Sequence, residues 1–531
     1  ENNEFVTPLV RALNIDPITP VRKANGTFAY SRYSDTDITN PVNAIEQTFD
    51  LWHSDRIVGS AFGELKLTPG LIFRSTYSVD ATFAQQNIFY PKFDLSNDPV
   101  LADAPAGEKR ATNSVVVNNN TWKNWQWENV LTWHAIFATR HDLALTGGVS
   151  ALENDHEYNG GANTNLPSND PKDAYISNTI DPITSQNAYG GAEECVLQSF
   201  FGRANYEFDG KYLVSVAFRA DGSSRFGANN RYGYFPAISA GWVLSHADFW
   251  KENGLVNFLK LRGSWGQNGN DKIGCYSFTT IVYSGQNYTF GPDQVITNGS
   301  VPLTAANPDL KWETIEQTDF GVDAELLNSR LSFTGDYYLK NTLDMLYAAP
   351  IPLTPGTAAP VRNVGSVQNK GVELALNYRN RDHAFKYSLG GNIAFVKNKV
   401  TSLGEGGEPV YGGRVQSANS DVTKTEVGQP IGSFFGFVTD GIFQNPREIE
   451  EAAFQNENTA PGDIRFKDLN GDRVINQADQ TYIGNPSPDL TYGLTLDLEF
   501  KGFDLGFFLQ GSQGNDIYNA TVRYDFTYGN R

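Results

Sequence analysis

One stretch decides how this chain folds: Arg219-Ala-Asp-Gly-Ser-Ser-Arg-Phe-Gly-Ala-Asn-Asn-Arg-Tyr-Gly-Tyr-Phe-Pro-Ala-Ile-Ser-Ala-Gly-Trp242, which closes on Phe249-Trp250. The residues leading into it, Tyr212 to Asp221, alternate between two kinds of side chain, as in a strand whose two faces meet different surroundings. A polar turn, Gly222–Tyr234, and a returning strand, Ala237–Leu244, follow. The pattern predicts an antiparallel strand pair and leaves open whether its apolar face meets protein or lipid.

The same alternation recurs along the chain. In each predicted strand, Leu, Val, Phe and Tyr occupy one face, while charged and hydroxyl side chains occupy the other. Gly335, in the middle of one strand, leaves room for a β-bulge. The predicted strands are Phe62–Thr68 with Leu71–Asp80, Asp142–Gly148, Phe200–Phe208 with Lys211–Asp221, Leu259–Trp265, Thr318–Leu326, Leu331–Lys340, Val372–Tyr378 with Tyr387–Phe395, and Tyr492–Phe500 with Phe503–Leu509.

Long polar segments separate the tight turns. The sequence predicts loops at Glu1–Asn43, before a short helical turn at Ala44–Gln47, and at Ala81–Thr121 and Val149–Asn187. Such loops count against a compact soluble domain, whereas a transmembrane barrel has tight turns at one end and long loops at the other. The predicted strands are 7 to 11 residues long, close to the roughly 9–11 residues that a bilayer crossing needs. We therefore expect an all-β fold, a transmembrane antiparallel β-barrel with long extracellular loops, although periodicity alone also allows a two-sheet sandwich.

Composition narrows the function further. The 531 residues include 50 Gly, 34 Phe and 25 Tyr, an enrichment that favours strands and turns. The net charge of −19 argues against nucleic acid as a partner, because nucleic-acid binding needs a basic surface. Cys195 and Cys275 are the two cysteines. A disulfide between them is one interpretation, and two unrelated free thiols are the one that the sequence favours.

Several motifs resemble those of the SusC/RagA family of TonB-dependent outer-membrane transporters of Bacteroidetes. The opening stretch is similar to that family's most recognisable barrel segment, and the match is good from about Ser199 to Asn519. Further motifs keep the family's order: Leu259-Lys-Leu-Arg-Gly-Ser-Trp-Gly-Gln-Asn-Gly269, Asn307-Pro-Asp-Leu-Lys-Trp-Glu313, Asn363-Val-Gly365, Asn369-Lys-Gly-Val-Glu373, Gly428-Gln-Pro-Ile-Gly432, Gly462-Asp-Ile-Arg-Phe-Lys-Asp-Leu-Asn-Gly-Asp472 and Ile483-Gly-Asn-Pro486.

The resemblance implies an importer. It implies a 22-stranded barrel with a plugged lumen, a SusD-like surface lipoprotein as a lid, energy from TonB, and an oligosaccharide or peptide as substrate. It also implies a place in the outer membrane of a Gram-negative, Bacteroidetes-like cell, in contact with lipid; a dimer of transporter–lipoprotein pairs is one arrangement. No plug domain precedes Glu1, so we expect residues 1–531 to be the barrel portion, with roughly two-thirds of the strands. The alternative is a secreted all-β carbohydrate-binding protein or glycan hydrolase.

One loop, within a segment at residues 461–482, has the spacing of a calcium loop. Calcium binds six to eight oxygen ligands, which a short acidic loop can supply. Two departures weaken the match: Arg473 stands where the turn favours Gly, and the last ligand is the short Asp479. The alternative is a solvated loop of Asx turns. The candidate ligands are Asp468, Asn470, Asp472, Val474 through its carbonyl, Asn476 and Asp479.

Other chemistry-bearing residues receive structural interpretations. Trp122, Trp125 and Trp127 fit an aromatic girdle or ordinary packing better than sugar stacking. His134 and His141 should lie on opposite faces, and none of the histidines shows metal-ligand spacing. We expect no catalytic residue and no organic cofactor. A hydrated inner wall explains the strand carboxylates better than a glycosidase pair does; they are Asp319, Asp323, Glu325, Asp336, Glu373, Asp497 and Glu499.

Within the opening stretch the expectation is specific. Val214, Val216 and Phe218 should face lipid, while Arg219 and Asp221 should face the lumen near the end of their strand. The turn Gly222–Tyr234, with Arg225 and Arg231, should be a fixed structural element.

Overall fold

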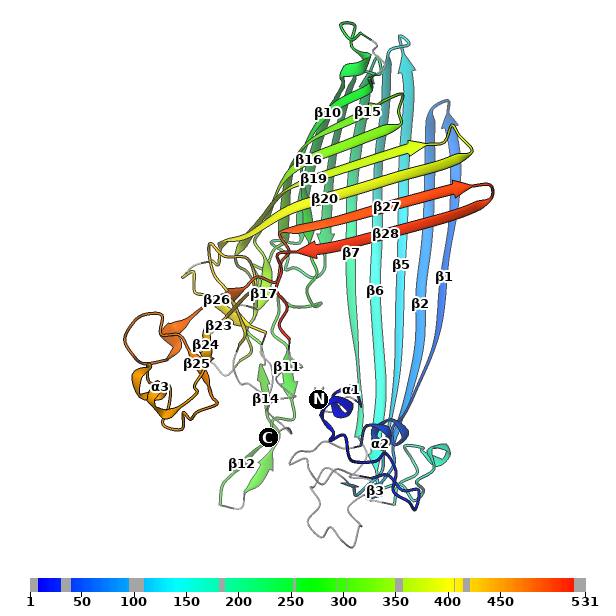
Figure 1. Ribbon diagram of the computed structural model, residues 1–531. Coiled ribbons are helices and arrows are strands. Elements are labelled where there is room, and N and C mark those ends of the chain that lie inside the picture. Colours follow the sequence, from blue (N-terminus) through cyan, green and yellow to red (C-terminus); the bar gives the residue numbers. More distant parts are fainter. Residues whose placement is uncertain are drawn as a thin grey trace.

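The computed structural model describes residues 8–29, 40–94, 109–180, 187–251, 255–292, 294–302, 304–348, 357–404, 406–413 and 421–519. Its main feature is a 14-stranded antiparallel sheet (Figure 1). Each strand of this sheet pairs with the sheet strands that come directly before and after it in the sequence. The strands are β1 (Phe49–Thr68), β2 (Leu71–Tyr90), β5 (Ser114–Phe137), β6 (His141–Thr164), β7 (Asn187–Phe208), β8 (Tyr212–Ser223), β9 (Tyr232–Val243), β10 (Val256–Asn270), β15 (Glu313–Leu326), β16 (Leu331–Leu343), β19 (Ser366–Asn380), β20 (Phe385–Ser402), β27 (Leu490–Phe500) and β28 (Phe503–Gln513).

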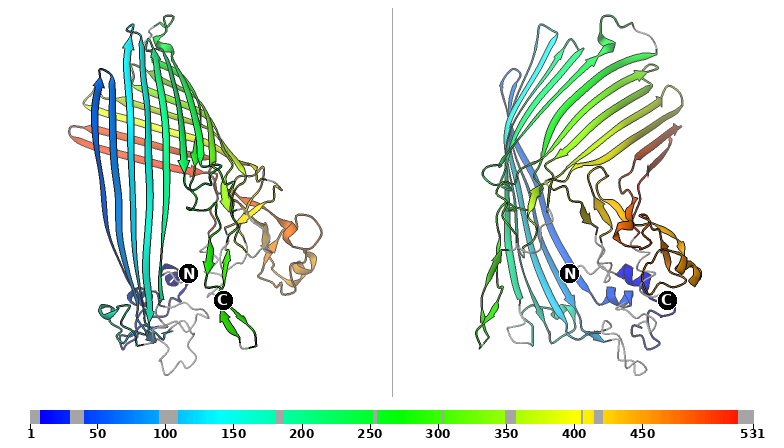
Figure 2. Two further views of the ribbon diagram at one scale, coloured as in Figure 1. Left: turned by 180° about the vertical axis from the view of Figure 1, so that it is seen from behind. Right: turned by 90° about the vertical axis from the view of Figure 1, so that its left-hand side faces the viewer.

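The sheet curves strongly without closing, as part of a barrel would (Figure 2). Tight turns join the strands at its upper end in Figure 1, and the long connections gather at the lower end. The predicted asymmetry between the two ends is therefore confirmed. Among the described residues, no helix has the length and apolarity needed to cross a membrane.

Smaller elements occupy the connections. The loop before β27 folds into a four-stranded sheet of β21, β22, β23 and β26. The elements are α1 (Pro8–Asn14), α2 (Pro41–Glu46), β3 (Phe93–Asp94), β4 (Lys109–Arg110), η3 (Pro171–Asp173), η5 (Leu244–His246), β11 (Val282–Ser284), β12 (Tyr288–Phe290), β13 (Val295–Thr297), β14 (Ser300–Pro302), β17 (Leu346–Ala348), β18 (Val361–Asn363), β21 (Val410–Gly412), β22 (Thr423–Thr425), β23 (Ser433–Phe437), β24 (Thr439–Ile442), α3 (Pro446–Glu451), β25 (Ile464–Phe466), η6 (Gln477–Asp479) and β26 (Gln480–Gly484).

The two faces of the sheet differ as the alternation predicts. On β8, Val214, Val216 and Phe218 point outward and are 39–50% exposed. Their neighbours on the other face, such as Ser215 and Ala217, are half-buried on the concave side. An apolar face that no protein covers is what a lipid-facing surface requires. The three side chains therefore lie on the outer face, where the sequence predicted lipid contact.

Aromatic residues mark two levels on the outer face. Trp125 and Trp127 on β5 lie at one level, where Trp125 stacks on Tyr77 of β2 at 6.1 Å. Phe137, at the tight-turn end of the same strand, marks the other level. A tilted strand that runs from Trp127 to Phe137 covers about 25 Å, the height of the apolar band in outer-membrane barrels.

The strands β1, β2, β5, β6 and β7 continue far beyond this band. Two of the sequence predictions were wrong for this part of the chain. Residues of the expected loops Ala81–Thr121 and Val149–Asn187 belong to β2, β5 and β6, which reach 20–24 residues in length. Past the bilayer the outer face no longer needs apolar residues, so the strand pattern disappears from the sequence. We call this extension the wall; it comprises Phe49–Val58, Asp80–Tyr90, Ser114–Asn124, Asn154–Thr164 and Asn187–Cys195.

The end of the wall that lies farthest from the tight turns is covered on its outer side by protein. Phe89 and Val115 are almost fully buried beneath Leu166 of the connection that follows β6. Such a cover is expected where the strands extend beyond lipid, because apolar side chains that face water there are better buried against protein.

Two smaller expectations also need correction. The expected loop Glu1–Asn43 contains α1 and the start of α2, which the side chain of Asn40 caps; residues 1–7 and 30–39 of that loop lie outside the described residues. No bulge occurs at Gly335, where pairing with both neighbouring strands is continuous. The glycine instead leaves space for the Phe333 ring, since a Cβ there would lie 3.0 Å from it.

Candidate functional site

The candidate site is the concave inner face of the sheet. The predicted carboxylates all occupy inward register positions on their strands. Arg262 of β10 bridges two of them, with Nε 3.0 Å from Asp323 and Nη1 2.6 Å from Asp336. Gly321 makes room for this bridge, because a Cβ there would lie 2.4 Å from Asp336 Oδ1. The bridge offsets one of the two negative charges and ties both carboxylates to one strand, which leaves the surface polar.

A hollow of about 400 Å³ lies in this inner face near the tight-turn end. Charges of both signs line it, including Asp142, Glu207, Lys260, Arg262 and Asp319. Ser264 donates to Asp319 at 3.3 Å. The hollow therefore offers hydrogen-bonding groups to whatever fills the lumen.

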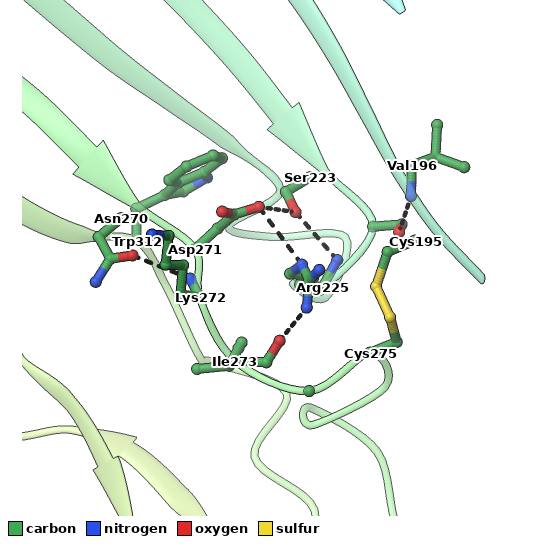
Figure 3. A network of polar contacts seen from close by, with 12 residues as sticks. Cys195, Val196, Ser223, Arg225, Asn270, Asp271, Lys272, Ile273, Cys275 and Trp312 are labelled. Atoms are coloured by element: carbon green, nitrogen blue, oxygen red, sulfur yellow. Dashed lines mark hydrogen bonds and ion pairs between the residues drawn. A yellow bond between two sulfur atoms is a disulfide. The ribbon is translucent and has the colours of Figure 1, made fainter. Parts of the chain in front are cut away.

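The turn of the opening stretch holds a long extracellular connection in place (Figure 3). Ser223 Oγ donates to Asp271 Oδ2 at 2.8 Å, and Arg225 lies 3.7 Å from the same carboxylate. Arg225 also donates to the carbonyl of Ile273. Phe226 is fully buried against Trp312 at 5.2 Å. The turn is a fixed structural anchor, as predicted.

The sequence interpretation of the cysteines was wrong. Cys195 and Cys275 form a disulfide with a Cα–Cα distance of 5.9 Å (Figure 3). It joins the wall end of β7 to the connection after β10, 80 residues away. The pairing could not be predicted, because the sequence shows neither that β7 extends to Cys195 nor that the connection folds back to meet it.

The calcium-loop candidates come together in one loop before β26. Asp468 accepts the N–H groups of Gly471 at 2.7 Å and Arg473 at 2.8 Å. Arg473 has φ +66°, so it adopts the left-handed conformation that favours Gly at this position. Each carboxylate oxygen of Asp468 keeps a further lone pair that could bind a cation.

The other candidate ligands complete the loop. Asp472 Oδ1 accepts the N–H of Val474 at 2.8 Å, and Asn476 caps η6. Asp479 is fully buried and accepts N–H groups of Leu469 and Asn476, each at 2.9 Å. The bond from Asn476 is the largest cause that lowers the pKa of Asp479. Across the described part of the chain, no group of three or more His, Cys, Asp or Glu side chains is placed to hold a metal, so calcium would depend on amide and carbonyl oxygens.

The tryptophans divide between the two faces. Trp125 and Trp127 lie in the outer aromatic level, which fits the predicted girdle. Trp122 lies on the inner face of the wall, where it stacks on His156 at 4.8 Å. His134 and His141 lie on opposite faces, as predicted, with His134 against Asp142 and His141 against Tyr206.

Comparison with known proteins decides the family. Residues 10–531 match the family model described as TonB dependent receptor-like, beta-barrel. The chain belongs to this family. TonB-dependent receptor P3 of Formosa agariphila is 31% identical over 528 residues, 96% of this chain and 49% of that protein. TonB-dependent receptor SusC of Bacteroides thetaiotaomicron is 32% identical over 368 residues, 67% of this chain and 34% of that protein.

A solved structure confirms the fold of this receptor barrel. The structure of the RagAB peptide transporter matches with a TM-score of 0.76 at 23% identity, over 92% of this chain and 50% of that chain. The chain spans about half the length of the curated relatives it matches. As a TonB-dependent receptor barrel, the protein is an outer-membrane protein of the Bacteroidetes type, and the apolar band is its lipid-facing surface.

Sequence reasoning missed the residues on the wall. Tyr158 fell within the expected loop Val149–Asn187, and Tyr189 lay just after it and outside every predicted strand, although both lie on the inner face of the wall. The available signal was the pair of glycines opposite them, Gly191 and Gly160, which a strand pattern alone does not explain.

Proposed function

We propose that this TonB-dependent receptor barrel imports a large nutrient across the outer membrane. The observation that carries the proposal is the two-sided sheet, with an apolar outer band and a charged, hydrated inner face. A barrel of this kind provides a polar path through lipid. The paired charges of the inner face support transport without covalent chemistry, because Arg262 forms ion pairs with both Asp323 and Asp336.

The proposal includes the partners of the family. A SusD-like lipoprotein would close the extracellular mouth, TonB would act through a plug domain, and pairs of transporter and lipoprotein could assemble as dimers. The names SusC and RagAB of two relatives support such partners. The substrate is an oligosaccharide or a peptide, too large for passive pores.

Uptake measurements test the proposal. Cells that produce the intact protein with its lipoprotein partner receive fluorescently labelled oligosaccharides and peptides, with and without TonB. We expect accumulation only with TonB. Equal accumulation without TonB would overturn active import. A gel provides the matched structural check: the intact barrel should need detergent and migrate faster unboiled than boiled.

We further propose that the loop from Asp468 to Asp479 binds calcium. The ligand spacing and the left-handed backbone at Arg473 support it. Asp468 and Asp472, each of which accepts backbone N–H groups of this loop, would supply carboxylate oxygens, and amide and carbonyl oxygens would supply the rest. Bound calcium would hold this loop against β26, to which Asp479 is directly joined.

Chelation tests the calcium proposal. We expect EDTA to speed proteolysis near Asp468 in the wild type, and calcium to restore protection. The Asp468→Asn variant should be cleaved fast in either buffer. Asp463→Asn, a nearby carboxylate outside the loop, should behave as the wild type. Proteolysis that EDTA does not change would rule calcium out.

A further inference from the structure

The inner face of the wall carries an unusual set of side chains. Its rings include Trp52, Trp122, Tyr158 and Tyr189, with His156 beside them. Six amide side chains lie among the other inward positions. They are Gln86, Asn118, Asn120, Asn124, Asn154 and Asn187.

Two tyrosine rings lie flat on the sheet. Tyr189 of β7 crosses Gly160 of β6: a Cβ on that glycine would lie 2.7 Å from the ring. Its hydroxyl reaches Asn118 on β5, one strand further on. Tyr158 crosses Gly191 in the opposite direction, since a Cβ there would lie 2.9 Å from its hydroxyl oxygen. Rings that fill the space above glycines present a face to the lumen.

Both rings remain accessible. Tyr158 is 41% exposed and Tyr189 is 38% exposed. The hydroxyl of Tyr158 has no partner among the residues that the structure describes, so it can bond a ligand. The ring of His156 lies 5.6 Å from that of Tyr158 and extends the row of rings to Trp122.

Hydrogen-bonding groups run beside the rings across the wall. Asn118 donates to Gln86 at 3.1 Å, and Gln86 donates to Asp50 at 3.0 Å. His156 contacts the amide oxygen of Asn120 at 3.1 Å. An amide group both donates and accepts, which matches a ligand whose hydroxyl groups do the same.

Within the described ranges, the charges of the inner face of the wall leave no free cation. On the inner face the single cation is Arg56, which is held by Asp80 at 2.6 Å. One inner carboxylate, Glu193, accepts the N–H of Cys275 at 3.2 Å. The outer face carries a larger share of the wall's charges: Asp55, Lys123, Asp155, Glu157 and Glu194. An anionic chain would therefore find no free cation on the inner face to offset the desolvation of its charges. An uncharged chain does not have this cost.

We propose that the inner face of the wall is a binding surface for a neutral oligosaccharide, held by the flat rings of Tyr158 and Tyr189. Sugar rings have apolar C–H faces, which stack on aromatic rings, and hydroxyl edges, which bond amides. The surface lies roughly 20 Å outside the apolar band along β6, so it meets substrate before the lumen does. The inference rests on the proposed import function and adds its substrate class and first contact.

Binding to the intact protein in detergent tests the inference. The probes are linear neutral oligosaccharides of glucose, galactose, mannose and xylose, peptides of equal length, and an anionic oligosaccharide, measured by calorimetry. We expect the wild type to bind a neutral oligosaccharide. Tyr158→Ala and Tyr189→Ala should each weaken binding roughly tenfold, because each removes one stacking ring.

Three further variants distinguish a change in the binding surface made by the two tyrosine rings from a failure to fold. Gly191→Ala should weaken binding with both rings present, because its Cβ lifts the Tyr158 ring off the sheet. Tyr158→Phe keeps the ring and should retain most of the affinity. Tyr175→Ala removes an exposed tyrosine from the outer side of the wall and should bind as the wild type. All variants should show the wild-type heat-shifted band.

The outcomes distinguish this inference from the proposed function. No neutral oligosaccharide bound by the wild type, or equal affinity in both tyrosine-to-alanine variants, overturns the inference. Peptides bound with the same tyrosine dependence overturn the ligand class. In each of these cases TonB-dependent uptake would still support the importer, while TonB-independent uptake would overturn the importer whatever the binding result.

Discussion

Two phenylalanines in or beside the turn Gly222–Tyr234 show how burial decides the role of a residue. Phe226 is fully buried with Trp312, Phe235 and Leu310, whereas Phe218 is 50% exposed on the lipid face. We predict that Phe226→Ala lowers the free energy of unfolding by about 3–5 kcal/mol. Phe218→Ala should cost less, since lipid tails fill the space. The temperature at which the heat-shifted band disappears measures both, and equal shifts would contradict the assignment.

The loop sheet before β27 contains a pH-sensitive pair. Tyr482 donates to Glu426, with Lys424 3.0 Å from the same carboxylate. The hydrogen bond from Tyr482, with help from Lys424, lowers the pKa of Glu426, and burial and then that hydrogen bond raise the pKa of Tyr482. Because the pKa of Glu426 is lowered, its ionised form stabilises the fold above about pH 4.3, and this stabilisation is lost in acid. Because the pKa of Tyr482 is raised, its protonated form stabilises the fold below about pH 10, and this stabilisation is lost in stronger alkali.

We therefore predict that protease resistance of residues 421–489 is greatest between these limits and falls on both sides. Tyr482→Phe should remove the alkaline loss and weaken resistance near neutral pH, because Glu426 then lacks its donor. Limited proteolysis across the pH range measures both effects. Resistance that is independent of pH in the wild type would argue against the pair.

At the scale of elements, the strands combine a membrane part and a solvent part. Leu145 and Glu157 occupy the same outer face of β6, and Ala144 the inner face. Spin labels at Leu145 should report lipid, while labels at Ala144 and Glu157 should report water. Val216 and Ala217 on β8 should differ in the same way, with lipid at Val216. A label at Glu157 that reported lipid would show that the wall lies in the bilayer.

This division explains what the sequence could predict. Wherever lipid covers one face, as on β8, β15 and β27, alternation placed the strands within a few residues. The wall was missed because its outer face does not need to be apolar along most of its length, so Asn, Gly and Asp replace much of the apolar half of the pattern. Ser114–Asn124 thus resembles a loop, although pairing on both sides makes it a strand.

The candidate sites follow the same physics. The calcium-loop ligands are local in sequence, so their spacing was visible, whereas the Cys195–Cys275 bond depends on segments 80 residues apart. The tyrosine platform depends on cross-strand register, because each ring needs the glycine opposite it. Register is set by the whole sheet and cannot be derived from either strand alone.

At the scale of the whole molecule, the sheet has two edges, β1 and β28, that pair with no other strand among the described residues. In lipid, each unpaired backbone group costs several kcal/mol, so an open sheet is unstable there. We predict that residues 1–531 produced alone give no heat-shifted band and aggregate outside detergent. The same chain joined to strands that pair both edges should give that band. A stable, heat-shifted product from residues 1–531 alone would mean that β1 and β28 close on each other, and the barrel would then be narrower than that of its relatives.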